Sequence, residues 1–257
     1  MSEAATRPDA TTHAARKGPE PPDLSEKGGL KNGQPQRSDE RLFMQLLAYG
    51  ACRDAGVLVR AVSEAGIEGA VYEDVNDPQG VAILTFAKDP SFFVTTLRPL
   101  LALRNEAWLA TLVPKPEFTM LGRTYSLGYE PDLVDALLHR PRRTVLNKDW
   151  PWAVWYPLRR SGRFAQLASE EQRVILAEHG AIGMAFGAAD YAHDIRLACY
   201  GLDKNDNDFV IGLIGKDLFP LSALVEAMRP TVQTSQYLEN LGPFFVGRAV
   251  WQSPLRD

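Results

Sequence analysis

Hydrophobic and polar residues divide the chain into a polar N-terminal stretch and a long, regularly patterned remainder. Residues 1–39 are rich in Pro, Gly, Ser, Thr and charged residues and contain almost no large apolar side chains. Such a segment buries too little apolar surface to offset the entropy that it loses on ordering. The pattern therefore predicts a disordered tail over 1–39 and, from Arg41 onward, a succession of strands and helices.

The patterned region contains the same order of elements twice. The first copy has expected strands at 41–50, 69–75, 80–87 and 108–113, with helices at 54–66 and 89–102. The second copy has expected strands at 152–159, 191–200, 208–214 and 243–250, with helices at 169–183 and 217–228. Each copy reads βαββαβ, which is the order of the ferredoxin-like unit.

A shared local signature supports this duplication. At 82–99 and again at 210–230, a strand runs through Lys-Asp into a helix that ends in Arg-Pro. The sequence thus predicts an α+β fold of two tandem ferredoxin-like units with antiparallel sheets, of the dimeric α+β barrel type. The expected organisation is a tail at 1–39, a first unit plus linker at 40–149 and a second unit at 150–257.

Composition narrows the class of protein. With 257 residues, 45% of them apolar, the chain can bury a sizeable core, and its net charge of −4 gives no basic footprint for nucleic acid. Cys52 and Cys199 are too few for a disulfide framework, which fits a reducing compartment. No apolar run approaches the ~20 residues of a membrane span, and the polar N-terminus lacks the core of a signal peptide. The expected location is the cytoplasm.

His179 is the only one of four histidines inside a helical apolar stretch. Ser169 and Gln172 form an expected N-cap and capping box, and Ile175 and Ile182 stand four residues before and three residues after the histidine. His179 is therefore expected to face the interior. It is either a core histidine with satisfied ring nitrogens or the single imidazole that a five-coordinate haem iron requires. Zinc motifs such as HExxH are absent from the sequence.

Four segments around His179 resemble, in order, the chlorite dismutase superfamily, which includes the haem-dependent coproheme decarboxylases. They are YPLRR at 156–160, ASEEQRVILAEHGAIG at 168–183, GLDKNDNDFVIGL at 201–213 and MRPTVQTSQYLENLGPFFVGR at 228–248. The resemblance implies that the second ferredoxin-like copy binds haem, that His179 is the proximal iron ligand and that the chain assembles as a homopentamer.

Tyr156 is the residue that best separates the activities within this superfamily. The resemblance implies that it becomes a radical that takes hydrogen from a propionate, and chlorite-degrading members generally lack it. On a strand, Tyr156 and Arg160 share a face, and a guanidinium pairs well with a carboxylate. Some decarboxylases of this superfamily carry a propionate-binding lysine at this position, so the resemblance implies that Arg160 holds a propionate, whereas Arg159 is expected to face the opposite way. The alternative for Tyr156 is an ordinary packing role.

Further propionate anchors are implied at the end of the chain. The resemblance assigns this role to Arg229 and to a hydroxyl from Thr234 or the adjacent Ser235. Arg229 has a second interpretation, because a basic residue at a helix C-terminus is favoured by the helix dipole.

The residue on the opposite, distal side of the haem is ambiguous. Counting back from Phe209 along the family pattern assigns Arg196 to this position, and counting from the GLD turn assigns Asp194, which lies on the same strand face. An arginine would stabilise an oxyanion and allow a chlorite-like activity, whereas an aspartate would disfavour anionic oxidants. An ion pair within the strand or to its neighbour is the alternative role for Arg196.

The function implied by the resemblance is a hydrogen-peroxide-dependent oxidative decarboxylation of coproheme (Fe-coproporphyrin III) in haem biosynthesis. Coproheme would be both substrate and cofactor, and two propionates would become vinyl groups to give haem b. The alternatives are a chlorite dismutase or peroxidase-like haem enzyme, and a non-catalytic haem-binding or haem-free structural member. The expected partners are the porphyrin and hydrogen peroxide, with no nucleic acid and no membrane span.

Overall fold

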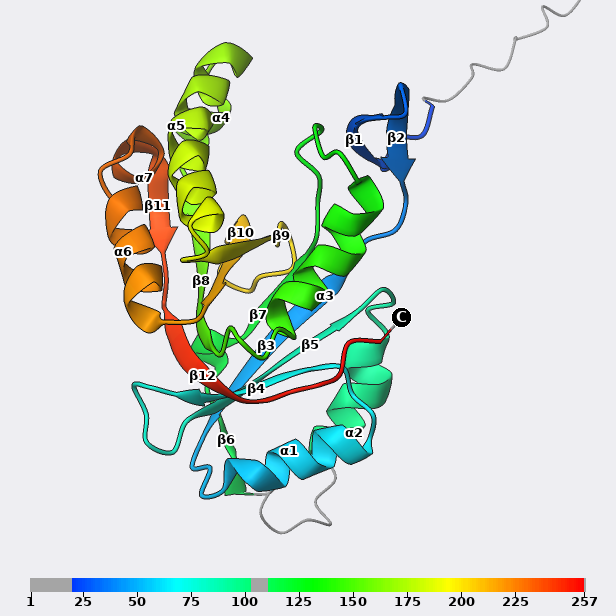
Figure 1. The fold of residues 1–257 in the computed structure, drawn as a ribbon, viewed down its shortest axis with the longest axis vertical. Helices are drawn as coiled ribbons and strands as arrows, with labels where there is room; N and C mark the ends of the chain where they lie inside the picture. Colours follow the sequence, from blue (N-terminus) through cyan, green and yellow to red (C-terminus); the bar gives the residue numbers. More distant parts are fainter. Residues whose placement is uncertain (1–19, 103–110, 257) are drawn as a thin grey trace, which may run out of the picture.

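The fold is an α+β barrel, seen here in a computed structural model that describes residues 20–102 and 111–256 (Figure 1). The strands are β1 (Glu26–Lys31), β2 (Gln34–Ser38), β3 (Phe43–Gly50), β4 (Gly69–Asp74), β5 (Val81–Ala87), β6 (Val113–Pro114), β7 (Met120–Arg123), β8 (Trp152–Arg160), β9 (His193–Ala198), β10 (Phe209–Gly215), β11 (Leu238–Leu241) and β12 (Phe245–Gln252). The helical segments are α1 (Ala55–Glu64), η1 (Phe93–Leu97), α2 (Arg98–Ala102), η3 (Pro116–Phe118), η4 (Asp135–His139), α3 (Arg140–Val145), α4 (Gly162–Ala165), α5 (Ser169–Ala188), α6 (Leu218–Met228) and α7 (Val232–Tyr237).

The duplication predicted from the sequence is present in the strand order. The first half of the chain gives β7-β3-β5-β4, and the second half gives β12-β8-β10-β9. In both halves this is the spatial order fourth, first, third, second, with antiparallel pairing throughout. The predicted fold class, two tandem ferredoxin-like units, is therefore confirmed.

The two halves join edge to edge into a barrel. β4 pairs with β12, and β7 meets β9 at a single residue pair, Arg123 with Ala198. The side chains that point inward from both halves form one core, because strand residues alternate between the two faces of the sheet. Trp155, Tyr72 and Phe245 are the largest of these, and each is at most 1% exposed.

Helices cover the outside of the barrel in two groups. α1 and the η1–α2 segment pack on the first half, around Leu58, Val62 and Leu97. α6 packs on the second half through Leu221 and Leu224, and α5 and α7 lie alongside it on the same side of the barrel (Figure 1). The second group of helices and the sheet of β8, β10 and β9 beneath it contain the residues that the sequence singled out.

Two sequence-based predictions were wrong. The fourth strand of the first unit is β7, not 108–113; only its last part, at β6, pairs with β3, and residues 108–110 lie outside the described residues. In addition, part of the predicted disordered tail is structured, because β1 and β2 form a hairpin over 26–38. The remainder of that prediction, at 1–19, lies outside the described residues.

The hairpin is held by polar side chains rather than by an apolar core. The Gln36 amide donates to the Glu130 carbonyl at 2.9 Å and accepts from the Leu133 N–H at 3.0 Å. The Glu26 carboxylate accepts from the Ser126 N–H at 3.0 Å. A polar composition alone could not reveal these contacts, since their partners lie about one hundred positions later in the chain.

Candidate functional site

Tyr156 and Arg196 lie on one outward-facing row of the second half-barrel. Ile211 of the central strand β10 pairs with Tyr156 of β8 on one side and with Arg196 of β9 on the other. Neighbouring strands are about 4.8 Å apart, so the two residues are separated by about 10 Å at the backbone. The strands thus bring a phenol and a guanidinium to the same face, beneath α5.

Arg196 forms an ion pair with Asp194, the other candidate for the distal position. The Arg196 Nε lies 2.9 Å from the Asp194 carboxylate, and both side chains are partly exposed. Burial tends to lower the pKa of Arg196, but Asp194 and Tyr125 outweigh this effect and the net shift is upward. The alternative in which Arg196 takes part in an intrastrand ion pair is therefore observed.

His179 sits on α5 and is half-buried rather than fully buried. Burial, Arg160 and Arg196 lower its pKa, in that order, against smaller opposing effects of Glu178 and Asp194. Its imidazole is therefore neutral at neutral pH and retains a lone pair for a metal. Its Nδ1 lies 3.5 Å from the Thr231 hydroxyl, and the other ring nitrogen, Nε2, forms no hydrogen bond to any described residue.

The start of α5 differs from the prediction by one residue. The N-cap is Ala168, not Ser169, so the cap has no hydroxyl to offer. Instead, the Glu171 carboxylate accepts from the Ala168 N–H at 3.2 Å, and the Gln172 amide donates to the Leu167 carbonyl at 2.9 Å. Side chains from the first turn thus satisfy the backbone at the helix start.

α5 is rich in apolar residues but is only partly buried against the barrel. None of its twenty residues is fully buried, although Ile182 and Phe186 pack on the cluster formed with α6. Val174 and Met184 are 62% and 71% exposed. A helix with this composition normally buries an apolar stripe in the protein core. Its incomplete burial leaves apolar surface on α5 for another group to cover.

Arg160, at the end of β8, is a largely buried cation whose guanidinium forms no ion pair with a described residue, although the Asp208 carboxylate accepts from its backbone N–H at 2.8 Å. Its guanidinium lies between the rings of Phe164 and Phe209, at 4.9 and 4.7 Å from their centroids. Its Nε is buried and has no hydrogen-bond partner among the described residues. Burial lowers the pKa of Arg160, and nearby Tyr125 offsets only part of this effect. A buried guanidinium with an unused donor is suited to bind an anion.

Arg159 behaves in the opposite way, as predicted for the other face of the strand. It forms ion pairs with Asp206 at 3.7 Å and with Glu239 at 3.4 Å. Of the two adjacent arginines, Arg159 thus has acidic partners, whereas Arg160 forms no ion pair with a described residue.

Tyr156 is buried at 8% exposure and stacks on Phe244, with ring centroids 4.5 Å apart. Burial raises its pKa, Asp194 adds to the increase and Arg229 opposes it. Its hydroxyl donates no hydrogen bond to another described residue. The phenol is therefore held in place by packing, keeps its proton at neutral pH and has a free O–H group.

The remaining predicted anchors, Arg229, Thr234 and Ser235, lie at the junction of α6 and α7. Arg229 is exposed, and its side chain has no ion pair within the described part of the chain. Ser235 already donates its hydroxyl to the Thr231 carbonyl at 2.8 Å, whereas the Thr234 hydroxyl contacts only the Thr231 hydroxyl, at 3.2 Å, among the described residues. Thr234 is thus the better placed of the two to provide a hydroxyl to a ligand.

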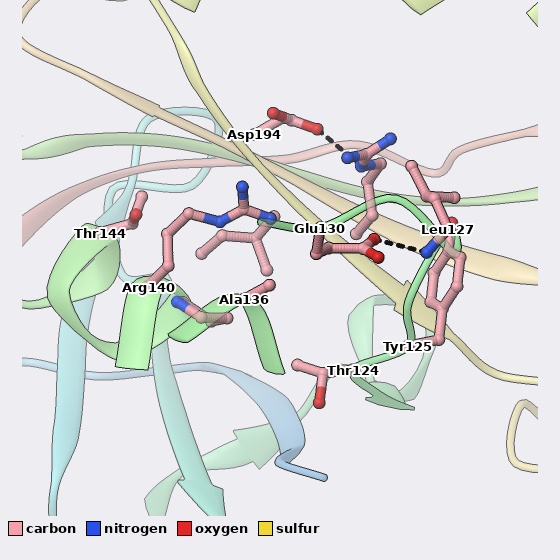
Figure 2. A pocket seen from close by; sticks show the side chains of 11 residues that line it. Thr124, Tyr125, Leu127, Glu130, Ala136, Arg140, Thr144 and Asp194 are labelled. Atoms are coloured by element: carbon pink, nitrogen blue, oxygen red, sulfur yellow. Dashed lines mark hydrogen bonds and ion pairs between the residues drawn. The ribbon is translucent and has the colours of Figure 1, made fainter. Parts of the chain in front are cut away.

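Two cavities lie beside this site, and neither is lined by His179, Tyr156 or Arg160. The smaller, of about 20 Å³, has Tyr125, Glu130, Arg140, Asp194 and Arg196 in its wall (Figure 2). The larger, of about 440 Å³, is lined by Arg140, Asp194 and the stacked pair of Trp150 and His193, among others. Asp194 borders both, so the cavities approach the site from the β9 side. Sequence reasoning missed Tyr125 and Arg140, because no motif marks them.

The donor set fits an iron porphyrin better than a bare metal ion. The described residues contain no group of three or more His, Cys, Asp or Glu side chains that could hold a metal. They do provide a single neutral imidazole, a buried guanidinium with a free donor and an incompletely covered apolar helix face. A haem needs one axial nitrogen, cations for its carboxylates and apolar walls for its ring.

Comparison with known proteins establishes the family. The chlorite dismutase family profile matches residues 93–250, more than half of the chain, so the protein belongs to the chlorite dismutase family. A comparison with curated protein sequences gave no match. None of the helices in the described ranges is long and apolar enough to cross a membrane.

Solved structures support the fold. A haem-binding protein from Thermus thermophilus is 18% identical, with a TM-score of 0.62 over 82% of this chain and 91% of that one. A variant of chlorite dismutase from Candidatus Nitrospira defluvii is 16% identical, with a TM-score of 0.60 over 84% of this chain and 93% of that one. At such low identity, these similarities concern the fold alone.

Proposed function

We propose that the protein binds coproheme between α5 and the sheet of β8, β10 and β9 and decarboxylates two of its propionates with hydrogen peroxide. The observation that carries this proposal is that two facing elements, α5 and β8, supply three chemically suitable residues. His179 offers a neutral nitrogen, Arg160 offers a largely buried cation with an unused Nε donor, and Tyr156 offers a protonated phenol whose O–H has no partner among the described residues. A haem-binding relative of the same fold is consistent with it.

In this proposal each residue has a defined task. His179 would be the axial ligand, and Arg160, Arg229 and Thr234 or Ser235 would bind propionates through charge-assisted hydrogen bonds. When bound, the iron porphyrin would supply the oxidising power that it gains from peroxide. Tyr156 would give up its hydrogen atom and then take one from the β-carbon of a propionate. Its raised pKa favours this role, because the phenol keeps its proton until it is oxidised.

The stoichiometry of this reaction is fixed by electron balance. Converting one propionate to a vinyl group releases carbon dioxide, one proton and two electrons. One hydrogen peroxide accepts these two electrons together with two protons, one from the propionate and one from solvent, and becomes two waters. Two equivalents of peroxide are thus expected per molecule of haem b.

A chlorite-degrading activity is the second candidate, and Arg196 is the observation that favours it. A guanidinium on the row of Tyr156 could stabilise a bound oxyanion. Its ion pair with Asp194 places a negative charge beside it, however, and this weakens the attraction for an anionic substrate. A non-catalytic haem-binding role would retain His179 but have no use for Tyr156.

The decisive experiment mixes the purified protein with ferric coproheme, titrates in hydrogen peroxide and follows the porphyrin masses. We expect successive loss of two carboxyl groups in the wild type. Tyr156→Phe should bind coproheme without mass loss, and His179→Ala should lose the Soret change on mixing. His193→Ala is the matched control, because this histidine stacks on Trp150 outside the site.

The other outcomes separate the alternatives. Binding without mass loss, together with oxygen release from chlorite, would favour the chlorite-degrading candidate. Absence of binding would overturn the haem site altogether. The homopentamer implied by the family resemblance remains a proposal, and sedimentation velocity of the same samples tests it.

A further inference from the structure

The His179 ring is linked to a residue that the sequence did not indicate. Its Nδ1 lies 3.5 Å from the hydroxyl oxygen of Thr231, which is 52 positions later in the chain. Thr231 is 2% exposed and is the N-cap of α7. The contact therefore joins α5 to the junction of α6 and α7 in a place that water barely reaches.

The single hydrogen of the Thr231 hydroxyl determines whether the hydroxyl or the His179 imidazole is the donor in this contact. A hydroxyl has one hydrogen to donate. The Met228 carbonyl, which can only accept, lies 2.8 Å from the Thr231 oxygen and is its shortest contact. With the hydrogen committed there, the oxygen has only lone pairs to offer to its other neighbours, which are His179 and, at 3.2 and 3.4 Å, the hydroxyl and the N–H of Thr234. The imidazole must then donate from Nδ1, so that Nε2 is left unprotonated.

A neighbouring contact keeps the two elements in this register. The carboxylate of Glu178, the residue before His179, accepts from the Val232 N–H at 2.9 Å. Two consecutive residues of α5 thus bind two consecutive residues at the start of α7. Because Glu178 is engaged with Val232, an uncharged hydroxyl and not a carboxylate is the partner of His179.

We propose that Thr231 is a positioning residue that holds His179 in the Nδ1–H tautomer and so reserves the Nε2 lone pair for iron. The role of Thr231 toward iron rests on the proposed haem function, whereas the tautomer of His179 can be measured without any haem. The hydrogen bonds of ligating histidines commonly fix their tautomer and orientation, and loss of such a partner costs about 10–100-fold in metal affinity. A neutral hydroxyl orients the ring without the added basicity that a carboxylate partner would confer.

The test is nitrogen-15 NMR of the haem-free protein labelled at histidine, with the His179 signals assigned by comparison with His179→Ala. The pH is kept at about 8, above the ordinary histidine pKa of ~6.5. We expect the proton on Nδ1 in the wild type and in Thr231→Ser. In Thr231→Val, which keeps the shape but loses the acceptor, this preference should be lost. A wild-type ring protonated mainly on Nε2 would overturn the proposal.

A control separates positioning from general loss of stability. Asp54→Ala removes the side-chain cap of α1, which accepts from the Gly56 N–H at 2.8 Å far from the site. It should leave the His179 tautomer unchanged. If Asp54→Ala altered the tautomer as much as Thr231→Val does, the proposal would fail. If Thr231→Val does not fold, the wild-type and Thr231→Ser spectra still decide the question.

Coproheme titration then tests the link to iron. Thr231→Val should bind coproheme about 10–100-fold more weakly than the wild type, and Thr231→Ser should bind nearly as well as the wild type. An unchanged affinity in Thr231→Val would overturn the role toward iron. If neither the wild type nor any variant binds coproheme, the proposed haem function is wrong. The NMR experiment still tests the His179 tautomer independently.

Discussion

Tyr156 and Arg196 are both register partners of Ile211, so they stand on one row of the sheet with a single strand between them. Tyr156 is buried and stacked, whereas Arg196 is partly exposed and paired with Asp194. The row thus presents a fixed oxidisable phenol at one end and a partly neutralised cation at the other. This asymmetry favours a decarboxylase over a chlorite-degrading enzyme, and it suggests separate tests for each end.

The Tyr156 end is tested by removal of one oxygen atom. Tyr156→Phe should fold with a free energy of unfolding within about 1 kcal/mol of the wild type, because the hydroxyl has no partner to lose. The stack on Phe244 is retained, so coproheme should still bind. Decarboxylation should fall below detection in the mass assay. Tyr191→Phe, at an exposed tyrosine that packs on Phe186, is the control that should keep activity.

The buried cation is tested by a pair of adjacent substitutions. Arg160→Met removes a guanidinium that forms no ion pair with a described residue. The desolvation cost that it relieves offsets the lost contacts with the Phe164 and Phe209 rings, so the haem-free protein should keep its stability to within about 1 kcal/mol. Coproheme affinity should fall by about 10–100-fold, which corresponds to loss of one charge-assisted hydrogen bond worth ~1.5–3 kcal/mol. Arg159→Met is the matched control on the opposite face and should bind normally. Equal losses in both variants would show that charge near the strand end, not Arg160 itself, matters.

Cys199 gives a test of pH dependence. It is fully buried, and its thiol donates to the Asn207 carbonyl at 3.0 Å in the turn that leads to β10. Burial, with smaller effects of Asp203 and Asp208, raises its pKa to about 12. The unfolded thiol ionises near its ordinary pKa of ~8.5. The stabilisation is therefore fully present below about pH 8.5 and is lost as the pH rises toward 12.

Urea unfolding at several pH values checks this expectation. The wild type should lose stability between about pH 8 and pH 11, and Cys199→Ser should lose less over the same range. Serine keeps a donor for Asn207 but does not ionise there. Other groups titrate in both proteins, so the difference between the two curves reports Cys199. Parallel curves would contradict the raised pKa.

The sequence predicted much of the fold because its signals are local. Period-two and period-3.6 patterns located β8, β10, α5 and α6 to within a few residues, and the repeated Lys-Asp and Arg-Pro signature revealed the duplication. The hairpin at 26–38 was missed, and β7 was not recognised as the fourth strand of the first unit. Their stability comes from partners distant in sequence, such as Gln36 with Leu133, which no local pattern encodes.

In the candidate site too, local properties could be predicted from the sequence and long-range contacts could not. Alternation along a strand correctly separated Arg160 from Arg159, because the face of a residue is a local property. It could not choose between Arg196 and Asp194, which share a face, and only the structure shows that they form an ion pair. The contact of His179 with Thr231 depends on how α5 lies against α7, so it required the three-dimensional arrangement.

The ion pair of Arg196 and Asp194 gives the last prediction, which concerns specificity. If Asp194 limits the attraction of Arg196 for anions, Asp194→Asn should strengthen the binding of anionic ligands such as chlorite to the haem-loaded protein. A partly exposed pair is worth about 0–1 kcal/mol, so the expected gain is up to about fivefold. Stopped-flow mixing with chlorite and an oxygen electrode would measure binding and turnover.

Asp190→Asn is the control, because Asp190 binds His193 and Lys216 outside the site. The double variant Asp194→Asn, Arg196→Leu should lose the gain, since the freed guanidinium is its cause. A gain that persists in the double variant would mean that Asp194 acts directly on the anion and that Arg196 is not the distal cation.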